Sequence, residues 1–379
     1  MHVRRWLAER LAGPEIRREA EARAARAEEA IRALDDGHWR ALERPGKTPP
    51  WHETLRTIEC VEATCRSNPL AARLVAMTTD FVVGAGARVT GHPFALRFWH
   101  DPLNAIDRRV HRWCDELSRA GELFLVLSRN PVTRMSYVRE VPASQIDILE
   151  TDPDDLERTL RYHQCTDTPE GRWWPAEAAA EGGDEPEQVM LHYCLNRQVG
   201  EVRGRSDLAQ VVTWLDRYDL WLEDRVRINR YKGAYLWHVR VQSPLPGQLE
   251  QRRAQYSRVP QSGSIIVTDA NEEWRAVQPQ IGADDVEADG KAIRLMVAAG
   301  VGVPLHFLAE GESANRATAR EMGTATYRHF QHRQRLFADI LEDVVRAAGR
   351  RAGLGDIAVH VALDPIPTGG SGESEEVNP

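Results

Sequence analysis

The sequence predicts an α+β protein that combines a mixed α/β part, long helices, a small β-containing segment and a helical C-terminal region. The first observation is length, because 379 residues suggest two or three structural units at roughly 150 residues each. The second is that hydrophobic residues make up 42% of the chain, enough to bury a substantial core. The third is a hydrophobic pattern that changes between helical spacing and short apolar runs typical of strands.

The first half of the chain predicts both helices and strands. Residues 1–50 form a charged helix ended by prolines, and residues 51–205 form the mixed α/β part. Within that part, helices are expected at 51–81, with a restart at Pro69, and at 104–120. Short apolar runs predict strands at 88–90, 123–127, 135–141, 145–149, 160–165 and 188–193. The segment 167–187 is rich in Pro, Gly, Ala and Glu, which predicts a surface excursion.

The second half predicts long helices around a small β segment. Ser206 is a good N-cap for a helix over 206–233, which at ~1.5 Å per residue is ~40 Å long. Residues 234–282 hold a strand over 235–241 and a hairpin made from 264–268 and 273–277. A second helix spans 283–300, with Asp284 and Asp285 at its N-terminus, and a loop spans 301–315. A long helix begins at Arg316 and reaches about Arg346 within the segment 316–364, and the acidic, Gly-rich tail 365–379 is expected to be disordered.

Composition and charge narrow the possible functions. Lys and Arg total 49 against 57 Asp and Glu, a net charge of −8, which argues against a protein whose main task is to grip nucleic-acid phosphates. No run reaches the ~18 apolar residues of a membrane span, and the charged opening lacks the apolar block of a secretory signal. The five cysteines include no CxxC pair, so reduced thiols in an intracellular protein are expected.

The motifs that could carry chemistry have simpler interpretations. Gly46-Lys47-Thr48 lacks the preceding strand of a phosphate loop, and Pro49-Pro50 interrupts the helix that should follow it. Val83 to Val89 resembles a dinucleotide loop without its third glycine, which favours a simple turn. His329 and His332 lie one helical turn apart without further ligands, which favours a solvated helix face. We therefore expect no catalytic residue, no metal site and no cofactor.

An ordered set of short blocks resembles the tailed-bacteriophage portal proteins, the head-to-tail connector family. The early blocks are Ser67-Asn68-Pro69-Leu70-Ala71-Ala72, Asp80 to Gly86, Trp113-Cys114-Asp115, Gly121-Glu122-Leu123-Phe124 and Val141 to Ile146. The later ones are Arg203-Gly204-Arg205-Ser206-Asp207-Leu208, Gly300-Val301-Gly302-Val303-Pro304 and Glu312 to Thr318. Each block is degenerate, but their order and spacing extend over about residues 55–350.

The resemblance implies a non-enzymatic ring, usually a dodecamer, at the capsid vertex of a virion. Double-stranded DNA would pass through it without sequence specificity during packaging and ejection. The implied partners are the terminase large subunit, a head-tail adaptor and the major capsid or scaffold protein, with assembly in the host cytoplasm. By position, 51–205 would be the wing, 206–233 and 283–300 the stem helices, 234–282 the clip, 301–315 the tunnel loop, and 316–364 a long helix with a small crown or wing return.

Candidate channel residues follow from that assignment. In the tunnel loop they are His306, Phe307, Leu308, Glu310, Glu312 and Asn315, and in the acidic stem lining they are Asp284, Asp285 and Glu287. Acidic side chains suit a conduit because they repel the DNA polyanion and leave it mobile. Twelve copies at −8 would place on the order of a hundred negative charges on the ring.

Two alternatives remain open at the level of sequence. One is an α/β enzyme of unrecognised type, acting through His192 or Asp207 near the turn at 200–204. A pocket that converges on those residues would favour it. The other is a different virion adaptor component that has helical rods but no continuous tunnel.

Overall fold

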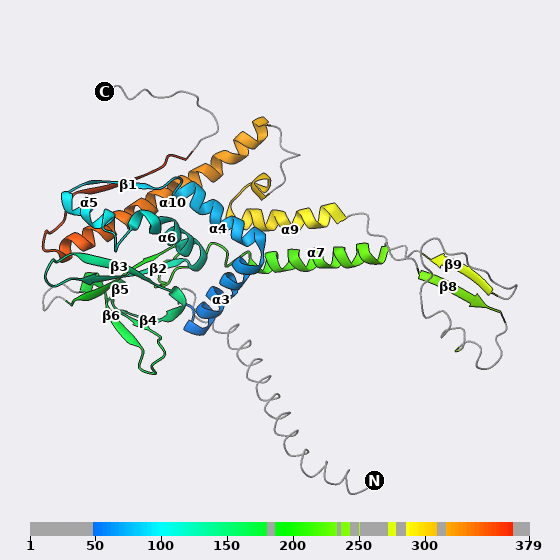
Figure 1. The fold of residues 1–379 in the computed structure, drawn as a ribbon, viewed down its shortest axis with the longest axis horizontal. Coiled ribbons are helices and arrows are strands. Elements are labelled where there is room, and N and C mark those ends of the chain that lie inside the picture. Colours follow the sequence, from blue (N-terminus) through cyan, green and yellow to red (C-terminus); the bar gives the residue numbers. More distant parts are fainter. Residues whose placement is uncertain are drawn as a thin grey trace, which may run out of the picture.

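The computed structural model describes residues 48–179, 186–232, 236–242, 250, 272–277, 286–308 and 316–366. A body of helices and small sheets carries two helices that project from it side by side, and a two-stranded sheet lies beyond their far ends (Figure 1). The projecting helices are α7, Val212–Lys232, and α9, Val286–Val301. The helix expected over 1–50 falls almost wholly outside the described residues, and so does the tail from 367.

The chain enters the body through two helices, α3 (Trp51–Ser67) and α4 (Pro69–Val82). Asn68 separates them, and its Oδ1 accepts hydrogen bonds from the amides of Leu70 at 2.8 Å and Ala71 at 3.1 Å. Because Pro69 has no amide hydrogen, it fits the first turn of α4 without losing a helical hydrogen bond. The predicted restart at Pro69 is confirmed.

Strand β1 (Ala87–Gly91), helix α5 (Pro93–His100) and helix α6 (Ile106–Ala120) follow. Helix α5, which is only eight residues long, was not predicted from the sequence. Its N-terminus is nevertheless capped, since the Phe94 amide donates to His92 Nδ1 at 3.1 Å. Gly121 ends α6 in the left-handed region at φ 79°, which suits glycine.

Two three-stranded sheets form the β part of the body. The first has the order β3-β2-β7, all antiparallel, and consists of β3 (Ser136–Val141), β2 (Glu122–Arg129) and β7 (Gln188–Cys194). The second has the order β4-β5-β6 and consists of β4 (Ile146–Asp152), β5 (Asp155–Gln164) and β6 (Arg172–Pro175). Strand β6 corrects the expectation of a plain surface excursion at 167–187, because Trp174 is buried beside Tyr162 in a hydrophobic cluster.

The apolar run in β2 is buried on both faces. Leu123, Leu125 and Leu127 belong to the main hydrophobic core, whereas Phe124 and Val126 belong to a second cluster that includes residues of the β4-β5-β6 sheet. Successive side chains on a strand point to opposite faces, so a continuous apolar run is what a doubly covered strand requires. The predicted buried strand at 123–127 is confirmed.

The stem helix begins later than predicted. Residues 207–211 form turns, and α7 starts at Val212, so its 21 residues replace the ~27 expected. Ser206 still acts as a local cap, since its Oγ accepts from the Leu208 amide at 3.0 Å. That same hydroxyl donates to the Ser118 carbonyl at 3.2 Å, which holds the turn against the end of α6.

The small sheet at the far end pairs β8 (Leu236–Val241) with β9 (Glu272–Val277), antiparallel and with Leu236 opposite Val277. The sequence analysis instead paired 273–277 with 264–268, a segment outside the described residues. The predicted start of the second stem helix at Asp284 and Asp285 also falls outside them, and α9 is described from Val286.

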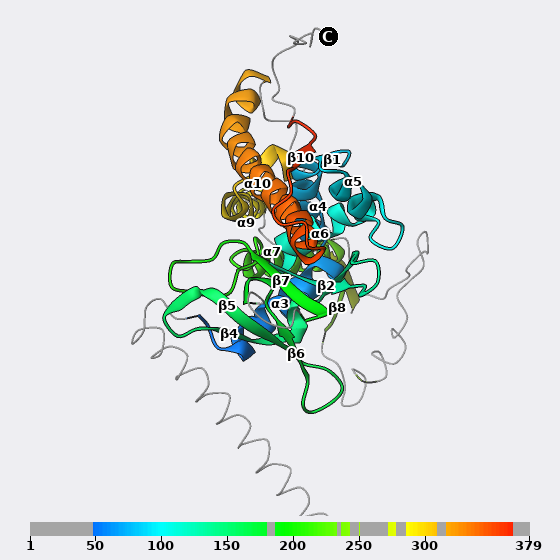
Figure 2. The same ribbon diagram turned by 90° about the vertical axis from the view of Figure 1, so that its left-hand side faces the viewer.

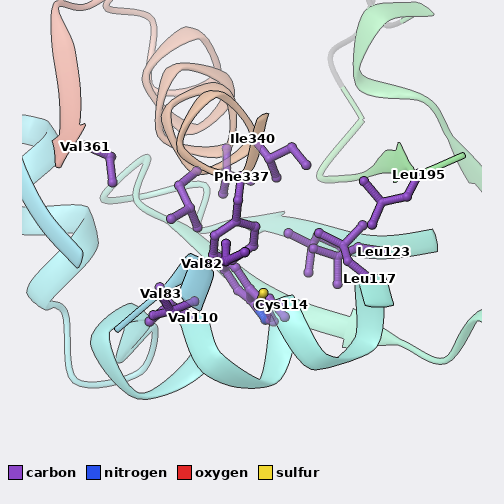
Figure 3. Close-up of a cluster of buried hydrophobic side chains, with 14 of the residues drawn as sticks. Val82, Val83, Val110, Cys114, Leu117, Leu123, Leu195, Phe337, Ile340 and Val361 are labelled. Atoms are coloured by element: carbon purple, nitrogen blue, oxygen red, sulfur yellow. The ribbon is translucent and has the colours of Figure 1, made fainter. Parts of the chain in front are cut away.

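The last helix packs against the body, and the strand after it pairs with the first strand. Helix α10 (Arg316–Arg351) extends a turn beyond the predicted end near Arg346 and is followed by β10 (Val359–Leu363), which pairs antiparallel with β1. Figure 3 shows Phe337 and Ile340 of α10 above Val82, Cys114 and Leu117, with Leu123 and Leu195 at one side. Turned by 90°, the body shows α10 and the β1-β10 pair on one side and the other sheets on the opposite side (Figure 2). No helix among the described residues is both long enough and apolar enough to cross a membrane.

Candidate subunit-contact and channel region

Glycine allows α7 and α9 to pack closely against each other. A Cβ built on Gly290 would lie 2.5 Å from the Trp221 ring, so any larger residue would push the helices apart. At the base of the pair, a Cβ on Gly300 would collide with Val211. Trp221 is itself stacked on Tyr218, with ring centroids 5.7 Å apart. The pair is therefore held where Trp221 of α7 fills space left by Gly290 of α9, and where Val211 fills space left by Gly300.

Large apolar side chains remain exposed on this helix pair. On α7, Leu220 is 62% exposed and Val226 51%. The same holds for Leu222 on α7 and for Leu295 and Met296 on α9. Five exposed large apolar side chains on two adjacent helices make this pair a candidate contact surface for another molecule.

Charged side chains accompany the apolar ones on these helices. Glu287 and Asp289 are exposed in the first turn of α9, where carboxylates favour the positive end of the helix dipole. Glu287 is thus the described member of the predicted acidic stem lining, while Asp284 and Asp285 fall outside the described residues. On α7, Arg227 forms exposed pairs with Glu223 and Asp224.

The segment after α9 folds back onto the body. Gly302 turns the chain at φ 73°, and Leu305–Leu308 form a short 3-10 helix, η3. Phe307 stacks on Phe81 of α4 at 5.8 Å, and Phe81 stacks on Phe330 of α10 at 4.6 Å.

This packing corrects part of the predicted tunnel loop. Leu308 is 3% exposed and Phe307 is partly buried against the core, so neither projects freely from the body in this conformation. Apolar side chains of that size gain more free energy in the core than in a water-filled channel. His306, half-buried, contacts the Phe307 ring edge-on. The other three predicted loop residues, Glu310, Glu312 and Asn315, fall outside the described residues.

A buried ionic cluster lies at the base of the projecting helices. The Glu122 carboxylate, at the start of β2, accepts from Arg203 Nη2 at 2.6 Å and Nε at 3.0 Å, and His192 Nε2 lies 3.1 Å away. Arg203 Nη1 also donates to the Ile146 carbonyl at 2.7 Å. Burial alone would raise the pKa of Glu122, but the Arg203 guanidinium and the His192 contact hold that pKa below its usual value. The cluster joins β2, β4 and β7 to the turn that leads into α7.

The next residues of the same block hold the base from a second side. Asp207 accepts hydrogen bonds from Ser118 of α6 at 2.8 Å, from Asn196 at 2.8 Å and from Arg333 of α10 at 2.7 Å. Gly204 approaches Gly121 so closely that a Cβ on Gly204 would collide with the Gly121 carbonyl. The Arg-Gly-Arg-Ser-Asp block is therefore a structural junction between the body and the projecting pair.

The enzyme alternative named two residues of this junction, and the structure engages both in other contacts. The His192 side chain is 6% exposed, stacks on Phe124 at 4.3 Å and faces Glu122. A cavity of about 580 Å³ lies between α3, residues 196–210, the end of α9 and α10, and Asp207 lines it whereas His192 does not. The two residues therefore do not converge on one pocket in the part of the chain that the structure describes.

Sequence reasoning missed the Glu122–His192–Arg203 cluster because its members lie far apart in the chain. The available signal was Glu122 itself, a carboxylate that opens an apolar strand and so requires a buried partner. Outside this region, Asp147, His163 and Cys165 form a group among the described residues that could hold a metal ion, and it lies on the β4-β5 pair.

Comparison with known proteins gives matches to solved structures alone. No protein-family model and no curated protein matches the sequence. A chain in the virion of a native gene transfer agent particle is 13% identical with a TM-score of 0.57, covering 82% of this chain and 85% of that chain. A chain in the neck of the native particle computed with C12 symmetry is 13% identical with a TM-score of 0.56, covering 86% and 87%. A crystal structure of an HK97 family phage portal protein from Corynebacterium diphtheriae is 12% identical over 80% of this chain and 95% of that chain, with a TM-score of 0.44.

At this level of sequence identity, the structural similarity is evidence for a shared fold only. It extends over more than four-fifths of both chains for the gene transfer agent components. The chain has the mixed α+β fold that was predicted, and it shares its fold with a component of gene transfer agent particles.

Proposed function

We propose that this protein is a portal-type subunit that assembles into a ring at a capsid vertex and serves as a conduit for double-stranded DNA. The observation that carries the proposal is the group of exposed apolar side chains on α7 and α9, in a chain whose fold matches a particle neck component. Identical helix pairs placed side by side bury these side chains on a neighbour. Such head-to-tail contacts form a closed ring when the rotation between copies closes.

We further propose a dodecamer, with the terminase large subunit, a head-tail adaptor and the major capsid or scaffold protein as partners. The neck to which this chain is similar was computed with C12 symmetry, which supports twelve copies. In this proposal the body is the wing, α7 and α9 are the stem, and the β8-β9 sheet belongs to the clip. Assembly takes place in the host cytoplasm before the ring joins the virion.

Channel residues are proposed from the same arrangement. Exposed Glu287, together with Asp284 and Asp285, supplies the acidic stem lining, and Glu310, Glu312 and Asn315 remain candidates for the tunnel loop. The burial of Phe307 and Leu308 supports a different role for them, since they hold the start of that loop against α4 and α10. Deleting 305–312 is therefore expected to destabilise the body as well as the loop.

The test of assembly is the size and symmetry of the full-length particle. Mass photometry at micromolar concentration should find a high-order oligomer, and class averages from negative-stain images should show a ring with an axial hole. A particle that remains a monomer or dimer at every concentration and salt would refute the proposal. An oligomer without an axial hole would instead identify the other alternative, a virion adaptor without a continuous tunnel.

The test of the acidic lining is DNA passage. Replacing Glu287 by Lys adds positive charge near the phosphates, so packaging should slow, and the delay should shrink as salt screens the attraction. Glu223→Lys, at an exposed position on α7 outside the proposed lining, is the matched control. A delay that does not depend on salt would contradict the electrostatic role of Glu287.

A further inference from the structure

The β4-β5 pair brings three different metal-ligating side chains together on one face. Asp147 lies on β4, His163 lies on β5, and Cys165 follows β5 directly. The ligand atoms of these three residues all lie within 4.8 Å of one another. No part of the body's main core or of the projecting helices needs this group.

The backbone explains why these side chains meet. Ile146 pairs with Gln164 and Ile148 pairs with His163, so β4 carries one extra residue, Asp147, in a bulge. His163 and Cys165 are two residues apart on an extended chain and therefore share a face. The Cys165 amide donates to the Gln145 carbonyl at 2.8 Å, which continues the pairing by one residue and fixes the position of the thiol.

The hydrogen bonds of His163 prepare its ring to bind a cation. Nε2 lies 3.1 Å from the Glu170 carbonyl, an atom that can only accept, so Nε2 carries a proton. A metal-binding histidine almost always donates its second ring N–H in this way, which fixes the tautomer that leaves a lone pair on the other nitrogen. That other nitrogen, Nδ1, lies 2.6 Å from Asp147 Oδ1, a distance at which Nδ1 donates a hydrogen bond to the carboxylate. A cation that binds between the two groups takes the place of this proton, which leaves to solvent.

The loop after β5 is shaped around the ring. A Cβ on Gly171 would collide with His163 Nε2, so glycine lets the 170–171 backbone approach the imidazole. Trp173 of β6 contacts the ring from another side, with centroids 4.9 Å apart. The His163 side chain is 14% exposed and that of Asp147 20%, whereas Cys165 is exposed. The ring is therefore held firmly, while the cysteine side of the group stays open to solvent.

We propose that Asp147, His163 and Cys165 bind a divalent cation of the zinc class, with water in a fourth position. One carboxylate, one imidazole and one thiolate are the donor types that Zn²⁺ accepts, and three protein ligands with one open position is an established coordination pattern. Ligands at Zn²⁺ distances of ~2.0–2.1 Å are about 3.3 Å apart, so Asp147 and His163 must separate by about 0.7 Å to admit the ion. The thiol releases its proton to solvent on binding, because the thiolate is the ligand.

The bound ion would join β4, β5 and the loop after β5 at the outer edge of the second sheet. Sequence reasoning did not find this site, because the ligands form no recognisable spacing motif and Asp147 reaches the others through a bulge. The proposal concerns the body and does not depend on ring assembly or on DNA.

The experiment is a titration of the full-length, chelator-treated protein with Co²⁺, which replaces Zn²⁺ and reports its ligands spectroscopically. One equivalent of Co²⁺ should produce a sulfur-to-cobalt charge-transfer absorption, and added Zn²⁺ should remove it. Cys165→Ser should abolish this absorption, and Cys60→Ser, at an exposed cysteine on α3, should leave it unchanged. Asp147→Asn and His163→Gln should each weaken Zn²⁺ binding by at least ~10-fold.

Circular dichroism of each variant checks that the fold is retained. Absence of the charge-transfer absorption at equimolar Co²⁺ overturns the proposal. It is equally overturned if the absorption persists in Cys165→Ser or if both Asp147→Asn and His163→Gln bind Zn²⁺ as tightly as the natural sequence.

Discussion

Helices α6 and α7 are of similar composition but are stabilised in different ways. On α6, one face carries Ile106, Val110 and Trp113, and each of these side chains is completely buried by α4, β2 and their neighbours. On α7, Leu220 and Val226 are more than half exposed, and only residues near the base and the glycine-facing side are covered. Helix α6 therefore buries its apolar face within the body, whereas α7 leaves part of its apolar surface exposed.

The polar contacts of the junction and of α7 also differ in how deeply they are buried. The base of the projecting pair is fixed by buried, multiply bonded charges such as Glu122 with Arg203, while the ion pairs along α7 are exposed. Exposed pairs contribute little free energy, and breaking a buried one is costly. The junction is therefore held by buried charges, whereas the ion pairs along α7 add little to its stability.

The largest effect is expected at the junction. Replacing Arg203 by Ala leaves the Glu122 carboxylate buried without its guanidinium, which should cost about 3–5 kcal/mol in the free energy of unfolding. Urea denaturation measures it. Arg161→Ala, in the surface pair with Glu150, is the control and should cost no more than about 1 kcal/mol. Equal losses in the two variants would remove the distinction between junction and surface.

The second effect is expected at low pH, where protonation of Glu140 should weaken a contact within the body. Burial raises the pKa of Glu140, but hydrogen bonds from Arg112, Trp113 and Arg109 outweigh it and lower that pKa to about 2. Because the pKa is lower in the folded state, the stabilisation is complete above about pH 4.5 and is lost as the pH falls toward 2. Protonation of Glu140 should lower the free energy of unfolding by at most about 3 kcal/mol.

The measurement for this second contact is the unfolding free energy from pH 5 to pH 2. The natural sequence should lose more stability over that range than Glu140→Gln, which has no carboxyl group to protonate. Glu150→Gln, in an exposed pair, should follow the natural sequence. Parallel curves for the natural sequence and Glu140→Gln would show that Glu140 does not tie β3 to α6 through its charge.

A smaller effect is expected where α7 meets α9. Gly290→Ala adds a methyl group 2.5 Å from the Trp221 ring, and overpacking of this kind costs about 1–3 kcal/mol locally. Hydrogen exchange should therefore accelerate in α7 and α9 and remain unchanged in α6. Ala288→Ser, at an exposed position of α9, is the control. Unchanged exchange in α7 would mean that the helices do not pack through Gly290.

Substitutions of the exposed apolar residues on α7 should change stability the least and assembly the most. Replacing Leu220 and Val226 by Ser removes only exposed apolar surface, so the unfolding free energy of the isolated chain should change by no more than about 0.5 kcal/mol per site. Mass photometry should nevertheless show a shift toward smaller particles. Leu103→Ser, at an exposed apolar residue of the body, should leave particle size unchanged. If the substitutions of Leu220 and Val226 also left the particle unchanged, the helix pair would not be the subunit contact.

The sequence predicted the elements that follow local rules. The break at Pro69, the doubly buried strand around Leu125 and the end of α6 at Gly121 each depend on residues close together in the chain. The mixed α+β fold was also predicted, because the change between helical spacing and short apolar runs reflects the order of these elements.

The features that were missed depend on distant partners. The sequence gives no local reason for α7 to start at Val212, since Ser206 is instead used to bond the end of α6. Phe307 and Leu308 were expected to lie in an exposed loop. They instead pack against the body, Phe307 against Phe81 of α4. The strand at Arg172–Pro175 likewise depends on pairing with β5 and on the burial of Trp174.

The pairing of β10 with β1 joins segments about 270 residues apart, with Arg88 opposite Ala362. The projecting helices and the small sheet are therefore an excursion inserted between two halves of one body. A ribosome must synthesise the entire excursion before the final strand can complete the core that begins with α3. A nascent chain that terminates early has no means of burying Val89 and the neighbouring apolar surface, so it is exposed to proteases and chaperones. Completion of this part of the core therefore waits for strand β10, the last strand that the structure describes.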